Sequence, residues 1–297
     1  MGSRNDSSSH TVRVGLVQSR CAATPEDNLR AALDGVRRAA RKGAGLVCLQ
    51  ELFRTRYFCQ VEDAELFDLA ETVPGPTSEA LASSARENNV ALVGSVFERR
   101  DAGVYHNTAL VFDADGALLG RYRKMHIPDE PLYHEKFYFT PGDTGFVSFE
   151  TRVARIGPLV CWDQWFPEAA RLTALRGAQI LLYPTAIGFE EDEEEHGSDQ
   201  REAWEVVQRG HAIANGVFVA AVNRVGREEG LEFWGASFVC DPLGRMLARA
   251  SRTEEEVLVV DCDLALVEET RRGWPFLRDR RVDAYEGLTS RLLDGAP

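Results

Sequence analysis

The sequence lacks the features of several common protein classes. No apolar run reaches the roughly 18 residues of a membrane-spanning helix, and the polar start MGSRNDSSSH does not resemble a signal peptide. Basic residues are few: 34 Lys and Arg stand against 47 Asp and Glu, for a formal net charge of −13. We therefore expect no membrane insertion and no nucleic-acid binding, which requires a basic face. An acidic protein is better suited to a small cationic ligand.

The sequence also lacks the common catalytic and metal-binding motifs. It has no CxxC, H-E-x-x-H, P-loop or G-x-S-x-G, and no histidine stands in a recognisable Cys-His or Ser-His-Asp context. The six cysteines, at positions 21, 48, 59, 161, 240 and 262, come without an export signal in a chain that is not small. We therefore expect reduced thiols, no zinc site and a cytoplasmic location.

The order of predicted elements favours one layered α/β domain. Helices are predicted at 25–42, with Thr24 as N-cap and Pro25 in the first position, and at 76–88, 167–176 and near 200–215. Strands are predicted at 12–17, 45–49, 90–97, 105–112, 117–122, 146–149, 152–160, 180–183, 217–222, 233–239, 245–250 and 256–261. Strands and helices alternate in blocks with hairpins between them, which predicts an α/β sandwich. We expect a disordered tail at 1–11, a single domain at 12–285 and a C-terminal tail at 286–297.

Three ionisable residues each follow an apolar strand. Glu51 follows Leu46–Leu49, Lys124 follows the second hairpin strand, and Cys161 ends the run 156–160. Taken singly, each has an ordinary interpretation, namely a surface carboxylate, a solvated lysine or a packed core cysteine. Together they are chemically coherent, because a cysteine nucleophile needs a base, which a buried glutamate supplies. A lysine cation, with a backbone N–H beside the nucleophile, can then hold an oxyanion.

Longer motifs resemble a known family. The stretches LVCLQELF, GRYRKMHIPD and CWDQWFPEAARL are similar to the nitrilase, or carbon–nitrogen hydrolase, superfamily. Within it, ELFRTRYFCQ, EKFYFTPGDTGF and FLRDRRVDAY are similar to the N-carbamoylputrescine amidase subfamily. The resemblance covers roughly residues 12–285 and implies a four-layer α-β-β-α sandwich, no metal or organic cofactor, and a homo-oligomer that is a dimer or larger.

The resemblance also implies roles for individual residues. Glu51 would be the general base, Lys124 the oxyanion-stabilising cation and Cys161 the nucleophile, with the backbone N–H of Trp162 completing the oxyanion hole. Glu135 matches a second glutamate that positions the lysine and the substrate, although the residues alone favour a loop salt bridge with Lys136.

The implied reaction cleaves the carbamoyl C–N bond of N-carbamoylputrescine through a Cys161 thioester, giving putrescine, carbon dioxide and ammonia. Tyr57, Trp162, Trp165 and Phe189 are predicted to line the methylene chain of this small cationic substrate, although Trp165 could instead be a core or subunit-contact residue. Alternatives are a β-ureidopropionase-like enzyme, an aliphatic amidase and, more remotely, a non-catalytic binding protein on the same fold. An anionic substrate would favour an arginine just after Cys161, where Trp162 and Asp163 stand.

Two positions depart from the family pattern. Pro158 lies within a predicted strand, where it cannot donate a ladder hydrogen bond. The loop after Gly188 carries the acidic run EEDEEE at 190–195. This run is either a solvated loop or a segment that attracts a diamine.

Overall fold

Two six-stranded sheets form the centre of the protein. The computed structural model describes residues 10–190 and 194–293, with the side chains of 194–198 outside that description. The first sheet has, in spatial order, β15 (Glu256–Asp263), β1 (Thr11–Gln18), β2 (Leu46–Leu49), β3 (Ala91–Asp101), β4 (Val104–Phe112) and β5 (Leu118–Arg123). The second has β14 (Met246–Arg249), β13 (Phe238–Cys240), β10 (Phe218–Val222), β8 (Ile180–Pro184), β7 (Arg155–Pro158) and β6 (Phe149–Glu150).

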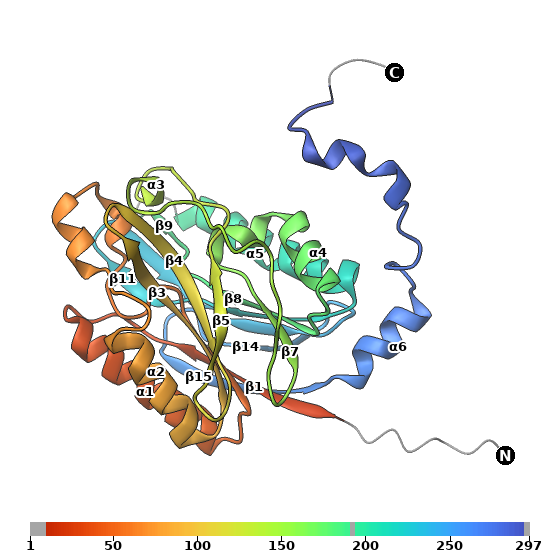
Figure 1. Ribbon diagram of the computed structural model, residues 1–297, viewed down its shortest axis with the longest axis horizontal. Helices are drawn as coiled ribbons and strands as arrows, with labels where there is room; N and C mark the ends of the chain where they lie inside the picture. Colours follow the sequence, from red (N-terminus) through yellow and green to blue (C-terminus); the bar gives the residue numbers. More distant parts are fainter. Residues whose placement is uncertain (1–9, 191–193, 294–297) are drawn as a thin grey trace.

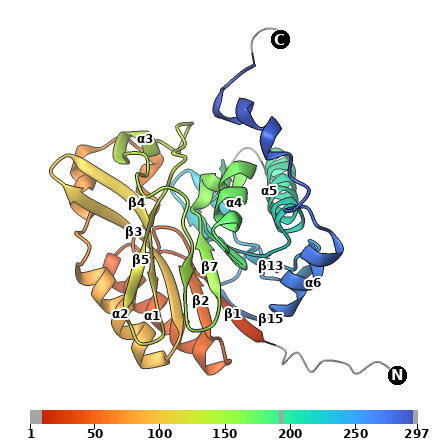
Figure 2. The same cartoon turned by 45° about the vertical axis from the view of Figure 1, so that its right-hand side comes forward.

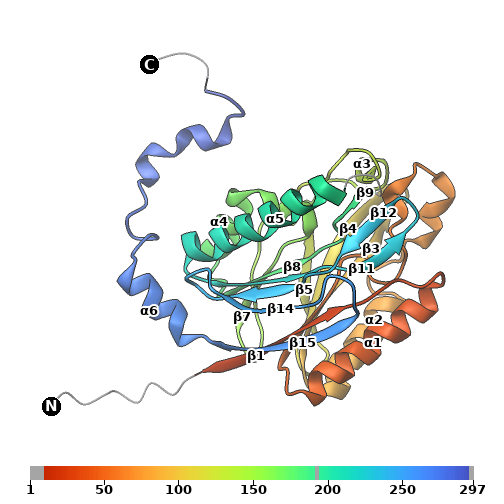
Figure 3. The ribbon, with the colours of Figure 1, turned by 180° about the vertical axis from the view of Figure 1, so that it is seen from behind.

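Helices cover the outer face of each sheet. Helices α1 (Pro25–Arg41) and α2 (Pro76–Asn88) pack on the first sheet, and α4 (Pro167–Leu175) and α5 (Glu194–Asn215) pack on the second (Figures 2 and 3). A large apolar cluster joins the inner faces of the two sheets, where β1 contacts β10 and β2 contacts β8. The predicted four-layer α-β-β-α sandwich is therefore confirmed.

Local sequence explains why α1 forms where it was predicted. The Thr24 hydroxyl accepts a hydrogen bond from the backbone N–H of Asp27, and Pro25 occupies the first turn. Ala32, Val36 and Ala39 are buried at helical spacing, so one stripe of α1 faces the sheet. Acidic residues in the first turn and arginines in the last turn complement the helix dipole.

A third, three-stranded sheet was not predicted. It has the order β11 (Val225–Glu228), β12 (Leu231–Trp234) and β9 (Gly188–Glu190). The prediction of one strand over 233–239 was wrong, because Gly235 and Ala236 have left-handed backbone, with φ of 54° and 55°. The chain turns there, and its two halves enter different sheets as β12 and β13.

Several boundaries differ from prediction. Strands β6 and β7 are shorter than expected, α5 begins earlier, and the long loop after β5 contains a short helix, α3 (Glu135–Tyr138). Helix α6 (Ala265–Gly273) was not predicted. Short 3-10 helices occur at Phe58–Gln60, Ala64–Leu69, Cys161–Trp165, Val282–Ala284 and Glu286–Thr289.

The two chain ends differ in how they relate to the sandwich. Strand β1 already begins at Thr11, and the rest of the predicted N-terminal tail, residues 1–9, lies outside the described residues. After α6 the chain runs away from the sandwich through 274–293 (Figure 1). In the part of the chain that the structure describes, no helix is both long and apolar enough to cross a bilayer.

Pro158 fits its strand because of the direction it faces. In the parallel pair of β7 and β8, the neighbouring Leu159 N–H donates to the Leu182 carbonyl at 2.9 Å. Alternate residues face opposite edges, so Pro158 faces the β6 side. Strand β6 pairs only with Arg155 and Ile156, so the missing N–H falls beyond the end of that ladder.

Candidate active site

Three strands deliver the predicted catalytic side chains to one buried location. Strand β2, which runs parallel to β1 and β3, leads into Glu51. Strand β5 leads into Lys124, and β7 leads into Cys161 at the start of a 3-10 turn. All three side chains are buried, and the Glu51 backbone N–H donates to the Thr185 carbonyl just past β8 at 3.4 Å, which joins the two sheets here.

The ammonium of Lys124 is held between two carboxylates. Its Nζ donates to Glu51 Oε1 at 2.9 Å and to the two oxygens of Glu135 at 2.8 and 2.7 Å. Glu135, in the first turn of α3, also accepts a hydrogen bond from the Tyr57 hydroxyl at 2.7 Å. Of the two partners considered for Glu135, the structure therefore shows Lys124 in an ion pair with it and not the adjacent Lys136.

Burial and mutual charge set the ionisation of this group. Burial alone would lower the pKa of Lys124, but the Glu135 and Glu51 carboxylates raise that pKa well above its ordinary value. Lys124 is therefore a permanent cation near neutral pH. Burial raises the pKa of Glu135 to about 7, against the opposing effect of Lys124.

Cys161 has an unusual backbone and a buried thiol. Its φ is 41°, a left-handed conformation that a residue with a side chain rarely adopts. The Sγ contacts the Ala186 carbonyl at 3.7 Å. Burial, and after it the nearby Glu51 carboxylate, raises the pKa of this thiol well above its ordinary value. The resting cysteine is therefore protonated and needs a base before it can attack a carbonyl.

Asp163 holds the turn that presents Cys161, and the sequence analysis missed this role. Its Oδ2 accepts from the Tyr122 hydroxyl at 2.8 Å and from the Val160 N–H at 2.9 Å. Its Oδ1 accepts from the His126 N–H at 3.1 Å and contacts the His126 ring nitrogen Nδ1 at 2.7 Å. Fully buried, Asp163 joins the turn after β7 to the segment after β5. The available signal was a carboxylate only two residues past the cysteine.

Asn107 is a second missed residue. Its side-chain amide on β4 donates to Glu51 Oε1 at 2.6 Å, and its oxygen accepts from the Ser95 hydroxyl at 2.9 Å. The other oxygen of Glu51, Oε2, is buried and has no hydrogen-bond partner among the described residues. That oxygen is available to accept a proton. An asparagine between His106 and Thr108, in the polar part of a predicted strand, was the only hint in the sequence.

A cavity of about 330 Å³ opens over Cys161. Its wall includes the predicted Trp162, Trp165 and Phe189, while Glu130 and Glu190 lie among its exposed residues. Tyr57, predicted beside the substrate, instead lies behind Glu135 and is not part of the wall. The full lining is Pro128, Glu130, Pro131, Tyr133, Cys161, Trp162, Trp165, Ile187, Gly188, Phe189, Glu190, Gln200 and Leu231.

Tyr133 fixes one wall of the cavity. Its hydroxyl donates to the Gly188 carbonyl at 3.1 Å and accepts from the Gly188 N–H at 2.9 Å, which joins the long loop to β9. Most of the predicted acidic run 190–195 lies outside the described residues or side chains, and Glu190 is its described member. Among the side chains that the structure describes, no group of three or more His, Cys, Asp or Glu could hold a metal ion.

Comparison with known proteins gives consistent matches over nearly the whole chain. The family model described as carbon-nitrogen hydrolase matches residues 13–272. An N-carbamoylputrescine amidase from Solanum lycopersicum is 45% identical over 294 residues, covering 96% of each chain.

Solved structures agree with this match. A carbon–nitrogen hydrolase from Helicobacter pylori G27 superposes with a TM-score of 0.93 at 46% identity, over 96% of this chain and all of that one. A glutamate-to-glutamine mutant of an amidase from Nesterenkonia sp. AN1 has a TM-score of 0.74 at 29% identity, over 95% of this chain and 98% of that one. That structure shows covalent addition of the acetamide moiety of fluoroacetamide at its active-site cysteine.

Proposed function

The chain belongs to the carbon–nitrogen hydrolase family, and on this premise we propose that it hydrolyses N-carbamoylputrescine to putrescine, carbon dioxide and ammonia. The observation that carries the proposal is the buried Lys124 ammonium between Glu51 and Glu135, whose charges act on the Cys161 thiol in the cavity wall. The similarity to plant N-carbamoylputrescine amidases over almost the full length supports the substrate.

In the proposed first step, Cys161 becomes the nucleophile. Glu51 takes the thiol proton on its unpartnered Oε2, and the thiolate attacks the carbamoyl carbon. Lys124 and the backbone N–H of Trp162 stabilise the oxyanion, and Glu135 holds Lys124 in place. Removal of one oxyanion donor typically lowers the rate by about 100- to 1000-fold. The covalent adduct on the related Nesterenkonia amidase supports a thioester at this cysteine.

The second half of the reaction regenerates the enzyme. Glu51 gives the proton to the leaving nitrogen, the C–N bond breaks, and a thioester forms on Cys161. Glu51 then takes a proton from one water molecule, whose oxygen attacks the thioester carbon and releases the thiol. The carbamic acid that forms splits into carbon dioxide and whichever of putrescine or ammonia did not leave in the first half, so one water is consumed in total.

The cavity suits an uncharged ureido group with a cationic tail. Trp162, Trp165 and Phe189 offer apolar and aromatic surface to a methylene chain. Glu130 and Glu190, exposed on the cavity wall, favour a terminal ammonium and repel a carboxylate. This charge pattern disfavours the β-ureidopropionase-like alternative, whose substrate carries a carboxylate.

We also propose that the protein works as a homo-oligomer in the cytoplasm. Exposed apolar side chains support self-association, because contiguous apolar surface commonly marks an interface. They lie on α4, on α5 and along 274–293, at Leu172, Leu175, Val206, Trp274, Phe276, Val282, Leu288, Leu292 and Leu293. All six cysteines are buried and free, as suits a reducing compartment.

The test of substrate is ammonia release from a matched panel. N-carbamoylputrescine, L-citrulline and N-carbamoyl-β-alanine all contain a ureido group, but the last two add a carboxylate. A simple aliphatic amide lacks the cationic tail, and Cys161→Ala serves as the blank. We expect the highest kcat/KM for N-carbamoylputrescine, with a preference that weakens as salt screens the acidic wall.

Two outcomes would overturn parts of this proposal. Preference for a carboxylate-bearing substrate would retain the Cys161 chemistry and reject the assigned tail. Turnover by Cys161→Ala, or by Cys161→Ser at near the wild-type rate, would reject the thioester mechanism itself.

A further inference from the structure

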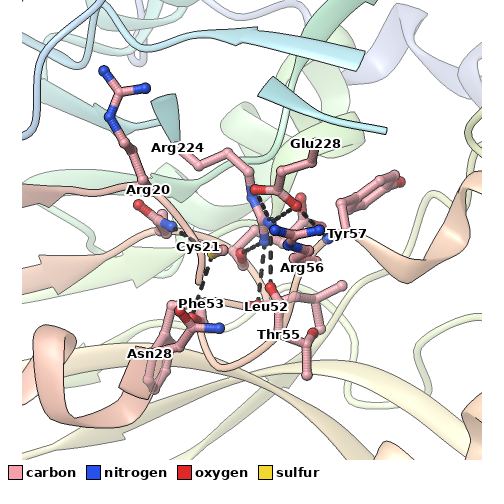
Figure 4. Close-up of polar contacts among 12 residues, drawn as sticks. Arg20, Cys21, Asn28, Leu52, Phe53, Thr55, Arg56, Tyr57, Arg224 and Glu228 are labelled. Atoms are coloured by element: carbon pink, nitrogen blue, oxygen red, sulfur yellow. Dashed lines mark hydrogen bonds and ion pairs between the residues drawn. The ribbon is translucent and has the colours of Figure 1, made fainter. Parts of the chain in front are cut away.

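A buried ion pair lies directly behind the proposed general base. Arg224 follows β10 and is fully buried, and its guanidinium nitrogen Nη1 contacts both oxygens of Glu228 on β11 at 2.9 and 3.0 Å. Figure 4 shows this pair beside the segment Leu52–Tyr57. Neither residue lines the cavity over Cys161, so the proposed chemistry has no direct use for either charge.

The second guanidinium nitrogen of Arg224 holds the backbone at the base. Nη2 donates to the carbonyl of Glu51 at 2.8 Å. It also donates to the carbonyl of Leu52 at 3.2 Å, and Figure 4 shows Arg224 beside Leu52. Leu52 has a left-handed φ of 45°, a conformation that persists only when its surroundings enforce it. The Leu52 N–H donates to the Ser95 hydroxyl at 3.2 Å, so both sides of this turn are fixed.

Glu228 holds the other end of the same segment. Its Oε2 accepts from the Tyr57 backbone N–H at 2.6 Å, and the Tyr57 hydroxyl donates to Glu135. The Arg224 guanidinium also lies over the rings of Phe233 and Tyr57, at 5.2 and 5.8 Å from their centroids. Arg224 thus contacts the backbone of Glu51 directly, and Glu228 is linked to Glu135 through Tyr57.

We propose that Arg224, together with Glu228, is a positioning residue that fixes segment 51–57 and so aims the carboxylates of Glu51 and Glu135 at Lys124 and Cys161. The inference rests on the proposed role of Glu51 as base. A planar guanidinium can serve the Glu51 and Leu52 carbonyls and the Glu228 carboxylate at once, which the single ammonium of a lysine cannot do. Arginine is therefore required here for its shape as well as its charge.

The primary test is Arg224→Lys, which retains the positive charge beside Glu228 but loses the fork. We expect kcat to fall by about 10- to 100-fold, since misplacement of a catalytic group by about 1 Å can cost about 100-fold. KM should change by less than about threefold, because the cavity wall is intact. The pH profile of kcat/KM should shift on the limb that reports the base.

A second readout does not depend on the substrate. The rate at which iodoacetamide alkylates Cys161 reports how readily Glu51 takes the thiol proton, and it should fall in parallel with kcat. If the wild type fails on N-carbamoylputrescine while Arg224→Lys still slows alkylation, the assigned substrate is wrong and the positioning role stands.

Two further variants separate positioning from stability. Val36→Ala removes buried methyl groups on α1 and serves as a control that lowers Tm without touching Arg224, Glu51 or their hydrogen-bond partners. The double variant Arg224→Met/Glu228→Gln removes both charges, which folds more readily than leaving one buried and unpaired. We expect it to fold and to lose kcat as Arg224→Lys does.

The proposal is overturned if Arg224→Lys retains the wild-type kcat and pH profile. It is equally overturned if Val36→Ala, at a matched loss of Tm, slows alkylation as much, or if the folded double variant turns over normally.

Discussion

At the scale of single residues, the cysteine and the glutamate depend on each other. Burial and the Glu51 charge hold the pKa of Cys161 above its ordinary value, so the thiol does not ionise by itself at neutral pH. Lys124 opposes this shift but is already engaged by two carboxylates. Proton transfer to Glu51 therefore has to accompany attack, and the unpartnered Oε2 is the atom that can receive the proton.

Glu51→Gln should consequently impair the cysteine itself as well as turnover. The amide retains the shape of the side chain, and Lys124 retains Glu135, so the fold should persist. We expect kcat and the rate of Cys161 alkylation to fall by about 100- to 10,000-fold, the usual contribution of a general base. Mass spectrometry of the alkylated peptide measures the second quantity, with Cys161→Ala as the zero. Alkylation of Glu51→Gln at the wild-type rate would show that another group takes the proton.

Sequence reasoning identified the three catalytic candidates but not what positions them. Glu51, Lys124 and Cys161 stand out because each ends an apolar strand. The contacts that tie Asp163, Asn107 and Arg224 to the site reach segments 37 to 173 residues away, and a pattern of neighbouring residues does not identify such partners. Tyr57 is a similar case, because its hydroxyl donates to Glu135, which lies 78 residues away in the chain.

At the scale of elements, strong local signals predicted well and weak ones did not. Helices α1 and α2 have proline in the first turn and a regular buried stripe, and both were predicted almost to the residue. Strands β9, β11 and β12 have only three or four residues, and β12 pairs with β9 across a long sequence separation. Gly235 was the only signal for the break between β12 and β13, because the left-handed Ala236 beside it is not a typical turn residue.

A buried carboxylate joins three strands of the first sheet. Glu98 on β3 accepts from the Thr108 hydroxyl on β4 at 2.6 Å and from Arg123 on β5 at 2.9 and 2.7 Å, and Arg121 adds a further ion pair. Burial alone would raise the pKa of Glu98, but Arg123, Thr108 and Arg121 outweigh it and lower the pKa to about 2. Because Lys124 directly follows Arg123, this cluster supports the strand end that carries the lysine.

Because the pKa of Glu98 is lowered in the folded state, the free energy of unfolding should fall as the pH falls. The folded state binds the proton more weakly than the unfolded chain, so the stabilisation is present above the ordinary pKa of about 4.5 and is lost as pH falls toward about 2. We expect Glu98→Gln to lower Tm at pH 7 and to converge on the wild type between pH 4.5 and 2. Thermal unfolding of both proteins across this range measures the effect, and a constant difference in Tm would contradict it.

At the scale of the whole molecule, the chain after α6 lacks a core of its own. Segment 274–293 extends from the sandwich (Figure 1), and it carries apolar side chains that water surrounds. Leu288 and Leu292 are 64% and 77% exposed, which is costly for leucines so near each other. Leu172 and Leu175 on α4 and Val206 on α5 are also exposed, which supports our proposal that a second copy of the chain covers the segment.

Charge on this segment should therefore prevent assembly without unfolding the protomer. Leu288→Glu/Leu292→Glu places two carboxylates where the proposed interface would desolvate them, whereas the isolated chain leaves both positions in water. We expect light scattering after size exclusion to show a dimer or larger species for the wild type and a smaller one for the variant. Glu286→Gln on the same segment is the control, because it adds no charge. A wild type that remains monomeric at micromolar concentration, or a variant with unchanged mass, would show that this segment does not form the interface. Unchanged Cys161 alkylation in the variant would show that each protomer still holds an intact site.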